Sequence, residues 1–473
     1  MNTYLFYDIE TTGLNRVFDQ VLQFSCIRTT VELEEIERHD IRVQLRPDVI
    51  PSPEALLTHR IPMETLLSGK CEFDATGRIH GLLNRPGTVS LGYNTLGFDD
   101  EFLRFAFYRN LLPPYTHQYD RGCGRMDLFP MTVIFWLYHR DVLQWPQKEG
   151  VTSLKLENLN AANRLTGGKS HEAMADVEAC LALARRFRRA GDIWHYLCDC
   201  FDKETDRLRI NSLPVVMDGP SGPHRLGIMV DGLFGSERNY QAPVICLGNS
   251  IPYTNQSLWL RLDLPELSTT RDDAIAETTW VMRKKMGEPG IVLPPRERFW
   301  KRLSAHSTGL AEENRRWLSK ETARFEKIVA YHRAYRYPQV PDIDPDGVLY
   351  ETGFLSPEEQ RLCRRFQSAS MEERLEIARR FSDPRVGALA RRVIFRNYPG
   401  QLGPELQQEF EAHLRIVNPH TADKAPVDYR GKRRRTPVEA LVEIERLSRE
   451  QNDAEAIGLL RDLRSYLEES FGS

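Results

Sequence analysis

Runs of hydrophobic residues with strand-like and helix-like spacing alternate along the first part of the chain. Short apolar, β-branched and aromatic runs bounded by turn residues predict strands at residues 4–10, 21–30, 41–45 and 88–93. Apolar residues at helical spacing predict helices within residues 51–68 and over residues 100–110, 126–138, 154–165 and 170–189, the last with Ser170 as its N-cap. Strands followed by strand–helix alternation predict an α/β domain with a mixed sheet.

The pattern changes after Gly191. Between residues 213 and 264, short strand-like runs are separated by Gly, Pro and Asn, which is typical of a small β-rich domain. Pro338–Gly347 is rich in proline and aspartate and predicts a linker. From Ser356 onward the pattern is amphipathic helix, broken at Pro399–Gly400 and around Asn418–Pro419. We therefore expect an α/β domain over residues 1–191, a β-rich domain over 192–340 and an all-α domain over 345–473.

Composition narrows the class of protein. The 473 residues are 41% hydrophobic and 28% charged, as in a globular chain, and no apolar run approaches the roughly 18 residues of a membrane span. Asp8 and Glu10 interrupt any signal-like segment, so we expect a cytoplasmic protein with no membrane contact. The eight cysteines form no C-x-x-C pair, which predicts reduced thiols. The net charge of −3 argues against a protein that coats nucleic acid through its overall charge. Basic clusters at 283–285 and 432–435 could still form a local nucleic-acid-binding surface, or equally an ordinary solvated face.

Two acids at the end of the first predicted strand suggest metal chemistry. Side chains two residues apart on a strand point to the same face, so Asp8 and Glu10 project together. Two like charges that close repel each other unless a cation lies between them, and hard carboxylate oxygens suit Mg²⁺ or Mn²⁺. Taken alone, such a pair is more commonly a solvated strand exit.

Three further residues stand in contexts that add to this pair. Asp99 lies where a predicted strand gives way to a helix, at the kind of crevice where α/β proteins bind ligands. Asp176 lies in the first turns of a helix, five residues after His171. Four acids and one histidine are the inventory for two-metal phosphodiester hydrolysis, in which a neutral histidine takes the proton of the attacking water. Each also has a structural explanation, as a helix N-cap, a surface acid and a loop histidine respectively.

The same residues form motifs that resemble a known family. Asp8-x-Glu10, Asn94-x₃-Phe98-Asp99 and His171-x₄-Asp176 resemble the three exonuclease motifs of the DEDD superfamily, His-containing branch. Their surroundings, together with Gly232–Gly235 and Arg396–Gly400, resemble bacterial exonuclease I over almost the whole chain. The resemblance implies a ribonuclease H-like exonuclease domain, a small SH3-like domain and a helical C-terminal domain, which close into a C-shaped clamp around single-stranded DNA.

The resemblance also implies an activity. In that family it is processive 3′→5′ digestion of single-stranded DNA to 5′-mononucleotides, in DNA repair and recombination, with two Mg²⁺ ions that Mn²⁺ can replace. The motifs assign the metal ions to Asp8, Glu10, Asp99 and Asp176 and the role of general base to His171. Because the motif places the ligand directly after Phe98, the adjacent Asp100 is expected as a helix N-cap.

Contacts with substrate and partner follow from the same resemblance. Glu10, Thr11 and Phe98 are expected to contact the terminal nucleotides, with Phe98 as a wedge. The family docks the acidic C-terminal tail of single-stranded-DNA-binding protein, and Tyr196 and Arg140 fall near the docking residues, although Tyr196 is equally explained as a buried core aromatic. We expect a monomer. Two alternatives stay open: an RNA-preferring 3′→5′ exonuclease, and a single-stranded nucleic-acid-binding adaptor with little catalysis.

Overall fold

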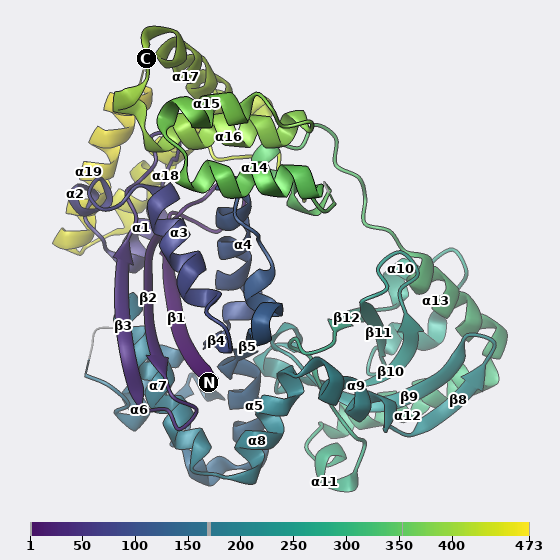
Figure 1. The fold of residues 1–473 in the computed structure, drawn as a ribbon. Helices are drawn as coiled ribbons and strands as arrows, with labels where there is room; N and C mark the ends of the chain where they lie inside the picture. Colours follow the sequence, from purple (N-terminus) through teal and green to yellow (C-terminus); the bar gives the residue numbers. More distant parts are fainter. Residues whose placement is uncertain (1, 168–171, 352, 473) are drawn as a thin grey trace.

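A computed structural model of the chain describes residues 2–167, 172–351 and 353–472. Its N-terminal region is built on a five-stranded sheet of order β3-β2-β1-β4-β5 (Figure 1). The strands are β1 Thr3–Thr11, β2 Val21–Thr29, β3 Glu35–Arg42, β4 Thr88–Gly92 and β5 Gly124–Asp127. β1, β2 and β3 pair antiparallel, whereas β4 runs parallel to β1 and β5 parallel to β4. This confirms the predicted α/β fold with a mixed sheet.

Two predicted elements of this region are wrong in position. The strand predicted at 41–45 begins at Glu35 and ends at Arg42. Its residues are mostly charged and exposed, so pairing with β2 rather than hydrophobic pattern defines it. The helix predicted at 126–138 begins only at Leu128, because Gly124–Asp127 form the short buried strand β5.

Helices cover both faces of the sheet. They are α1 Pro53–His59, α2 Met63–Leu66, α3 Glu72–Leu83, α4 Asp99–Arg109, α5 Leu128–Tyr138, α6 Leu156–Asn163 and α7 Ala173–Arg188. Leu5, Tyr7 and Ile9 of β1 pack with α3 and α4, whereas Phe6 packs in the cluster that contains α5 and α7. Because strand side chains alternate between faces, Asp8 and Glu10 lie on the same face as Phe6, toward α7.

The β region follows two short helices, α8 Asp192–Cys198 and α9 Lys203–Asn211. Its strands are β8 Val215–Gly219, β9 Gly222–Val230, β10 Gln241–Asn249, β11 Gln256–Arg261, β12 Val281–Lys285 and β13 Ile291–Leu293, all paired antiparallel. The helices α10 Ile275–Thr278, α11 Glu297–Trp300, α12 Ala305–Lys320 and α13 Thr322–Ala334 accompany them. The predicted β-rich character is confirmed. Ile228 and Val230 of β9 share a core cluster with α5, which joins this region to the first.

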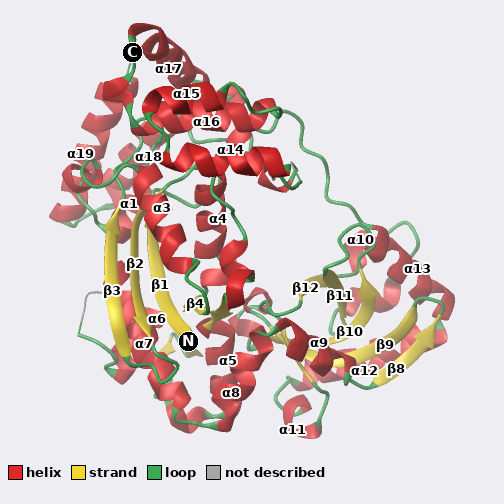
Figure 2. Ribbon diagram, viewed as in Figure 1, coloured by secondary structure: helices red, strands yellow, loops and turns green. Residues whose placement is uncertain are grey.

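The helical region contains α14 Pro357–Ser368, α15 Met371–Ala378, α16 Pro384–Asn397, α17 Pro404–Val417, α18 Pro437–Glu450 and α19 Ala454–Phe471. Helices end before both predicted breaks, at Asn397 and Val417. Figure 2 shows the preceding linker as a long loop that runs from α13 to α14. The helical region packs on the end of the N-terminal sheet beside α1, and the β region lies to one side. No helix among the described residues is long and apolar enough to cross a membrane. The three domain boundaries stay a prediction.

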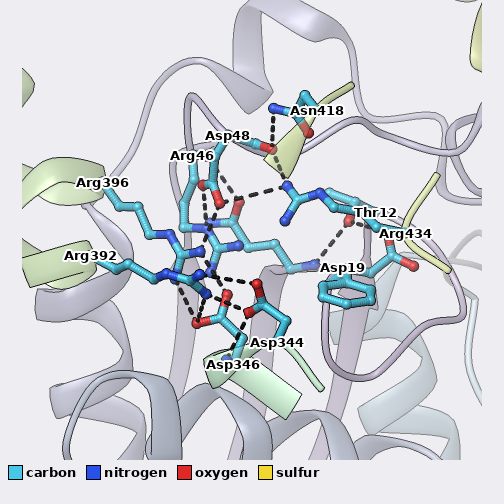
Figure 3. A network of polar contacts seen from close by, with 12 residues as sticks. Thr12, Asp19, Arg46, Asp48, Asp344, Asp346, Arg392, Arg396, Asn418 and Arg434 are labelled. Carbon is cyan, nitrogen blue, oxygen red and sulfur yellow. Dashed lines mark hydrogen bonds and ion pairs between the residues drawn. The ribbon is translucent and has the colours of Figure 1, made fainter. Parts of the chain in front are cut away.

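Buried ion pairs fasten the helical region to the N-terminal region (Figure 3). A guanidinium nitrogen of Arg396 lies 2.6 Å from a carboxylate oxygen of Asp346 and 3.0 Å from one of Asp48. Burial alone would raise the pKa of Asp48, but Arg396, Arg46 and Arg434 hold it far below its usual range. Removing one partner from such a buried group costs about 3–5 kcal/mol, so the two regions are expected to move together.

Candidate active site

The four predicted carboxylates come from three elements and lie close enough for Asp99, Glu10 and Asp176 to act on Asp8. Asp8 and Glu10 belong to β1, Asp99 opens α4, and Asp176 lies in the first turn of α7. The backbone N–H of Ile9 donates a hydrogen bond to Oδ1 of Asp99 at 3.2 Å, which ties the start of α4 to β1 between the two strand acids. Asp8, Glu10 and Asp176 are each partly exposed, so the group is open to solvent.

These acids perturb one another. Burial and the charges of Asp99, Glu10 and Asp176 raise the pKa of Asp8 well above its usual value. Burial and the charge of Asp176 raise the pKa of Glu10 to about 8. Because each acid penalises ionisation of the next, the group is costly at neutral pH without a compensating cation.

Asp99 and its neighbour Asp100 have opposite environments. Burial and nearby acids raise the pKa of Asp99 well above its usual value. Asp100 instead accepts from Arg104 at 2.6 Å, from Arg125 at 2.6 Å and from His117 at 2.8 Å. Burial opposes ionisation of Asp100 as well, but the two guanidinium groups hold its pKa well below the usual range. The N-cap role expected for Asp100 is wrong, because α4 begins at Asp99 with Phe98 as its N-cap residue.

The acid group fits divalent cations by charge and ligand type. Among the described residues, no basic side chain forms an ion pair with Asp8, Glu10 or Asp99. Their oxygens are the hard ligands that Mg²⁺ and Mn²⁺ prefer. No three acidic, histidine or cysteine side chains of the described part of the chain already converge into a ready metal cluster. Carboxylates that repel one another are expected to stay apart until a cation lies between them.

Asp127 is a positioning residue that the sequence reasoning missed. Its Oδ1 accepts from the backbone N–H groups of Asn94 at 2.8 Å and Phe129 at 2.9 Å, and its Oδ2 from that of Leu96 at 3.1 Å. One carboxylate therefore caps α5 and shapes the turn that leads to Asp99. An acid directly before a predicted helix is an N-cap signal, but the misplaced helix start at residue 126 hid it.

The remaining predicted site residues have the following positions. The hydroxyl of Thr11 donates to the carbonyl of Gly13 at 2.8 Å and is buried. Phe98 is half-buried, with its ring centroid 4.8 Å from that of Phe102. His171 and the proposed N-cap Ser170 lie outside the described residues, and the N-cap position of α7 is Glu172.

A basic hollow of about 900 Å³ lies between the N-terminal region and the β region. Its lining includes Arg104 of α4, Tyr350, and a set of cations on the β-region side, namely Lys203, Arg207, Arg225, Lys285 and Arg333. Lys203, Arg225 and Arg333 form no ion pair with a carboxylate of the described residues. Such uncompensated cations suit a phosphate backbone.

The residues of the two basic clusters, 283–285 and 432–435, do not all line one surface. Lys285 lines this hollow, but Lys284 is buried and pairs with Asp206 at 2.8 Å, and the guanidinium of Arg283 stacks on the ring of Tyr335. Alternation along β12 separates them. Residues 432–435 line a second hollow, of about 730 Å³, between the helical region and the turn that follows β1.

Tyr196 and Arg140 both reach the surface. The ring of Tyr196 is 37% exposed, so its alternative reading as a buried core aromatic is wrong. The guanidinium carbon of Arg209 lies 3.9 Å from its ring centre, and the charges of Arg296 and Arg298 also act on it. Arg140 is exposed and stacks on Trp136.

Comparisons with known proteins agree with this architecture. The sequence model of the family described as "Exonuclease" matches residues 5–184, and that of the "Exonuclease I C-terminal domain" matches residues 343–470. Exodeoxyribonuclease I of Escherichia coli is 28% identical over 438 residues, which cover 88% of this chain and 90% of that protein. The chain resembles exonuclease I over nearly its whole length, in its nuclease region and in its C-terminal region alike. A Buchnera aphidicola exodeoxyribonuclease I is 33% identical over 189 residues, which cover 39% of this chain and 46% of that one.

The likeness extends to three dimensions. A solved structure of E. coli exonuclease I with a dA16 oligonucleotide superimposes with a TM-score of 0.87 at 25% identity, covering 99% of this chain and 100% of that one. The resemblance inferred from the three motifs is thus confirmed, including the expectation of an enzyme. All four predicted carboxylates lie within the residues that the exonuclease model matches.

Proposed function

We propose that this protein degrades single-stranded DNA processively in the 3′→5′ direction and releases 5′-mononucleotides. The observation that carries the proposal is the set of uncompensated carboxylates Asp8, Glu10 and Asp99, in a chain that matches the family nearly end to end. A basic hollow lined by Arg104, from the helix that Asp99 opens, accompanies them. An adaptor that only binds nucleic acid has no use for acids that repel its ligand.

The three motifs assign the catalytic roles in this proposal. Asp8, Glu10, Asp99 and Asp176 would hold two Mg²⁺ ions, which supply an activated water and charge stabilisation at the leaving oxygen. Asp99 is held against β1 by the N–H of Ile9, so its carboxylate is oriented before substrate binds. We assign His171, five residues before Asp176, as the general base. Thr11 and Phe98 flank the acids as contacts for the terminal nucleotide.

Grip on the strand would come from the basic hollow. Cations without carboxylate partners attract phosphates without reading sequence, and exposed aromatic rings stack on any base. Tyr119, which is 59% exposed beside Lys203, and Tyr350 supply such rings. The strand would lie between two regions of one chain, an arrangement that favours many cleavages per binding event.

Product analysis tests this function. A 5′-labelled single-stranded DNA oligomer, with RNA and duplex controls, is incubated with Mg²⁺ and, separately, with EDTA. We expect Mg²⁺-dependent shortening of single-stranded DNA from its 3′ end, with duplex and RNA spared. Equal degradation of RNA would overturn the substrate assignment, and binding without cleavage would favour the adaptor.

We further propose that the surface around Tyr196 docks the acidic C-terminal tail of single-stranded-DNA-binding protein. Arg209 stacks on the partly exposed ring and the charges of Arg296 and Arg298 act on it, so an acidic peptide with an apolar end would find both cations and an aromatic face. Arg140 would extend the basic side of this surface. Fluorescence anisotropy with a labelled acidic tail peptide, against a charge-neutral version, measures the docking.

A further inference from the structure

The turn of residues 12–20, which joins β1 to β2, connects the two acid-bearing segments of the site. It begins two residues after Glu10. From within the turn, Nη2 of Arg16 donates to the carbonyl of Gly97 at 2.6 Å, two residues before Asp99. A displacement of this turn would therefore act on acids from both β1 and α4.

The helical region holds this turn. Nδ2 of Asn15 donates to Oδ2 of Asp428, a buried residue of the helical region, at 3.0 Å. The guanidinium of Arg434 lies over the ring of Phe18 at 5.6 Å, and Val17 and Phe18 are buried in a cluster with helical-region side chains. Figure 3 shows Arg434 beside Thr12 and Asp19, at the two ends of the turn.

The helical-region partners are themselves fixed. Oδ1 of Asp428 accepts from the backbone N–H groups of Arg430 at 2.8 Å and Lys432 at 2.9 Å. Arg434 donates to the carbonyl of Asp48, whose carboxylate pairs with Arg396 (Figure 3). The support behind the turn is thus a buried, hydrogen-bonded network, which resists displacement.

We propose that the helical region positions the turn of residues 12–20, through the Asn15–Asp428 hydrogen bond, and thereby sets the rate of phosphodiester cleavage. This inference rests on the proposed function. Asp428 is a positioning residue: it acts on the acids through Asn15 and the turn. Misplacement of reacting groups by as little as about 1 Å can cost up to about 10²-fold in rate, so loss of one such tether is expected to be measurable.

A pair of reciprocal substitutions isolates this hydrogen bond. In Asp428→Asn, Oδ1 still accepts from the backbone, but an N–H group faces the N–H group of Asn15. Adding Asn15→Asp supplies a new acceptor, while its other oxygen still accepts from the backbone N–H of Val17. The double variant therefore restores the bond with donor and acceptor exchanged. Asp462→Asn, at an exposed position of α19, is a charge-matched control in the same region.

The measurement separates cleavage from binding. Single-stranded DNA is bound in EDTA at saturating protein, its dissociation constant is obtained by anisotropy, and Mg²⁺ then starts a single turnover. We expect Asp428→Asn to slow the first cleavage about tenfold with the dissociation constant within about twofold, and the double variant to recover to within about twofold of wild type. An unchanged rate, or a slowed rate that Asn15→Asp does not restore, overturns the inference. Failure of the wild-type protein to cleave would instead overturn the proposed function.

Discussion

Replacing each of two adjacent, buried aspartates by asparagine should have opposite consequences. Asp99 belongs to the repelling acid group, so Asp99→Asn removes both a charge that destabilises the metal-free fold and a proposed metal ligand. Asp100 pairs with both Arg104 and Arg125, so Asp100→Asn removes a buried counter-charge that the two guanidinium groups share and leaves each with a single carboxylate partner. Both variants make the same Asp→Asn change at neighbouring positions, so each is a control for the other.

The magnitudes follow from these contacts. Loss of a metal ligand removes several kcal/mol of transition-state stabilisation; about 4 kcal/mol corresponds to a rate about 10³-fold lower. Breaking the buried ion pairs of Asp100 costs about 3 kcal/mol, which lowers the melting temperature by roughly 6–12 °C for a domain of this size. We therefore expect Asp99→Asn to be inactive with an unchanged or higher melting temperature in EDTA, and Asp100→Asn to be less stable yet active when folded.

The assay combines calorimetry in EDTA with the first-cleavage rate at a temperature where both variants are folded. Asp141→Asn, at an exposed position, controls for the amide substitution itself. The reasoning is refuted if Asp99→Asn lowers the melting temperature as much as Asp100→Asn does. It is also refuted if Asp100→Asn, while fully folded, loses activity to the same extent as Asp99→Asn.

Four further predictions address the rest of the proposal. In the metal-free protein Glu10 keeps its proton up to about pH 8, whereas in the unfolded chain it loses the proton near the ordinary pKa of about 4.3. Because the native state binds more protons between these values, melting temperatures in EDTA should fall as the pH rises from about 5 to 8. The fall should be smaller in Glu10→Gln. His171→Ala should slow single-turnover cleavage about 10²–10⁴-fold, and a near-normal rate would remove it from the role of base. Arg225→Ala should weaken DNA binding for every sequence and reduce the slope of log K against log salt by about 0.7, which a salt titration measures. Tyr196→Ala should weaken binding of the acidic tail peptide about tenfold in anisotropy, and equal affinity would exclude this surface.

The sequence predicted the fold wherever burial leaves a pattern. β2 is buried along its whole length and was located within one residue, whereas β3 is an edge strand of exposed charged residues whose existence depends on pairing with β2. β5 is only four residues long and merges with the apolar start of α5. Both strands are specified by neighbours distant in sequence, which a local pattern does not contain.

In the site, too, local pattern predicted some features, whereas others depend on residues distant in sequence. The spacing of Asp8 and Glu10 on one strand was enough to place them together, because strand geometry is local. The opposite states of Asp99 and Asp100 depend on Arg125 of β5 and His117, which only the folded chain brings to Asp100. In the sequence, residues 283–285 form one basic cluster, but alternation along β12 buries Lys284 between two more accessible neighbours.

Helix α4 contacts the acid group, the basic hollow and the end of the linker. Its first residue is Asp99, its second is the buried ion-pair centre Asp100, and its third, Glu101, accepts from the hydroxyl of Tyr350 at the end of the linker at 2.6 Å. Arg104, one turn on, pairs with Asp100 and Glu101 and lines the basic hollow. In the proposed complex, a DNA strand in this hollow would therefore contact Arg104, which lies on the same helix as the proposed metal ligand Asp99. The end of the linker is bonded to the same helix through Tyr350. We infer that α4 fixes the position of Asp99 relative to both the β region and the helical region. DNA binding and the position of the acid then depend on this one helix.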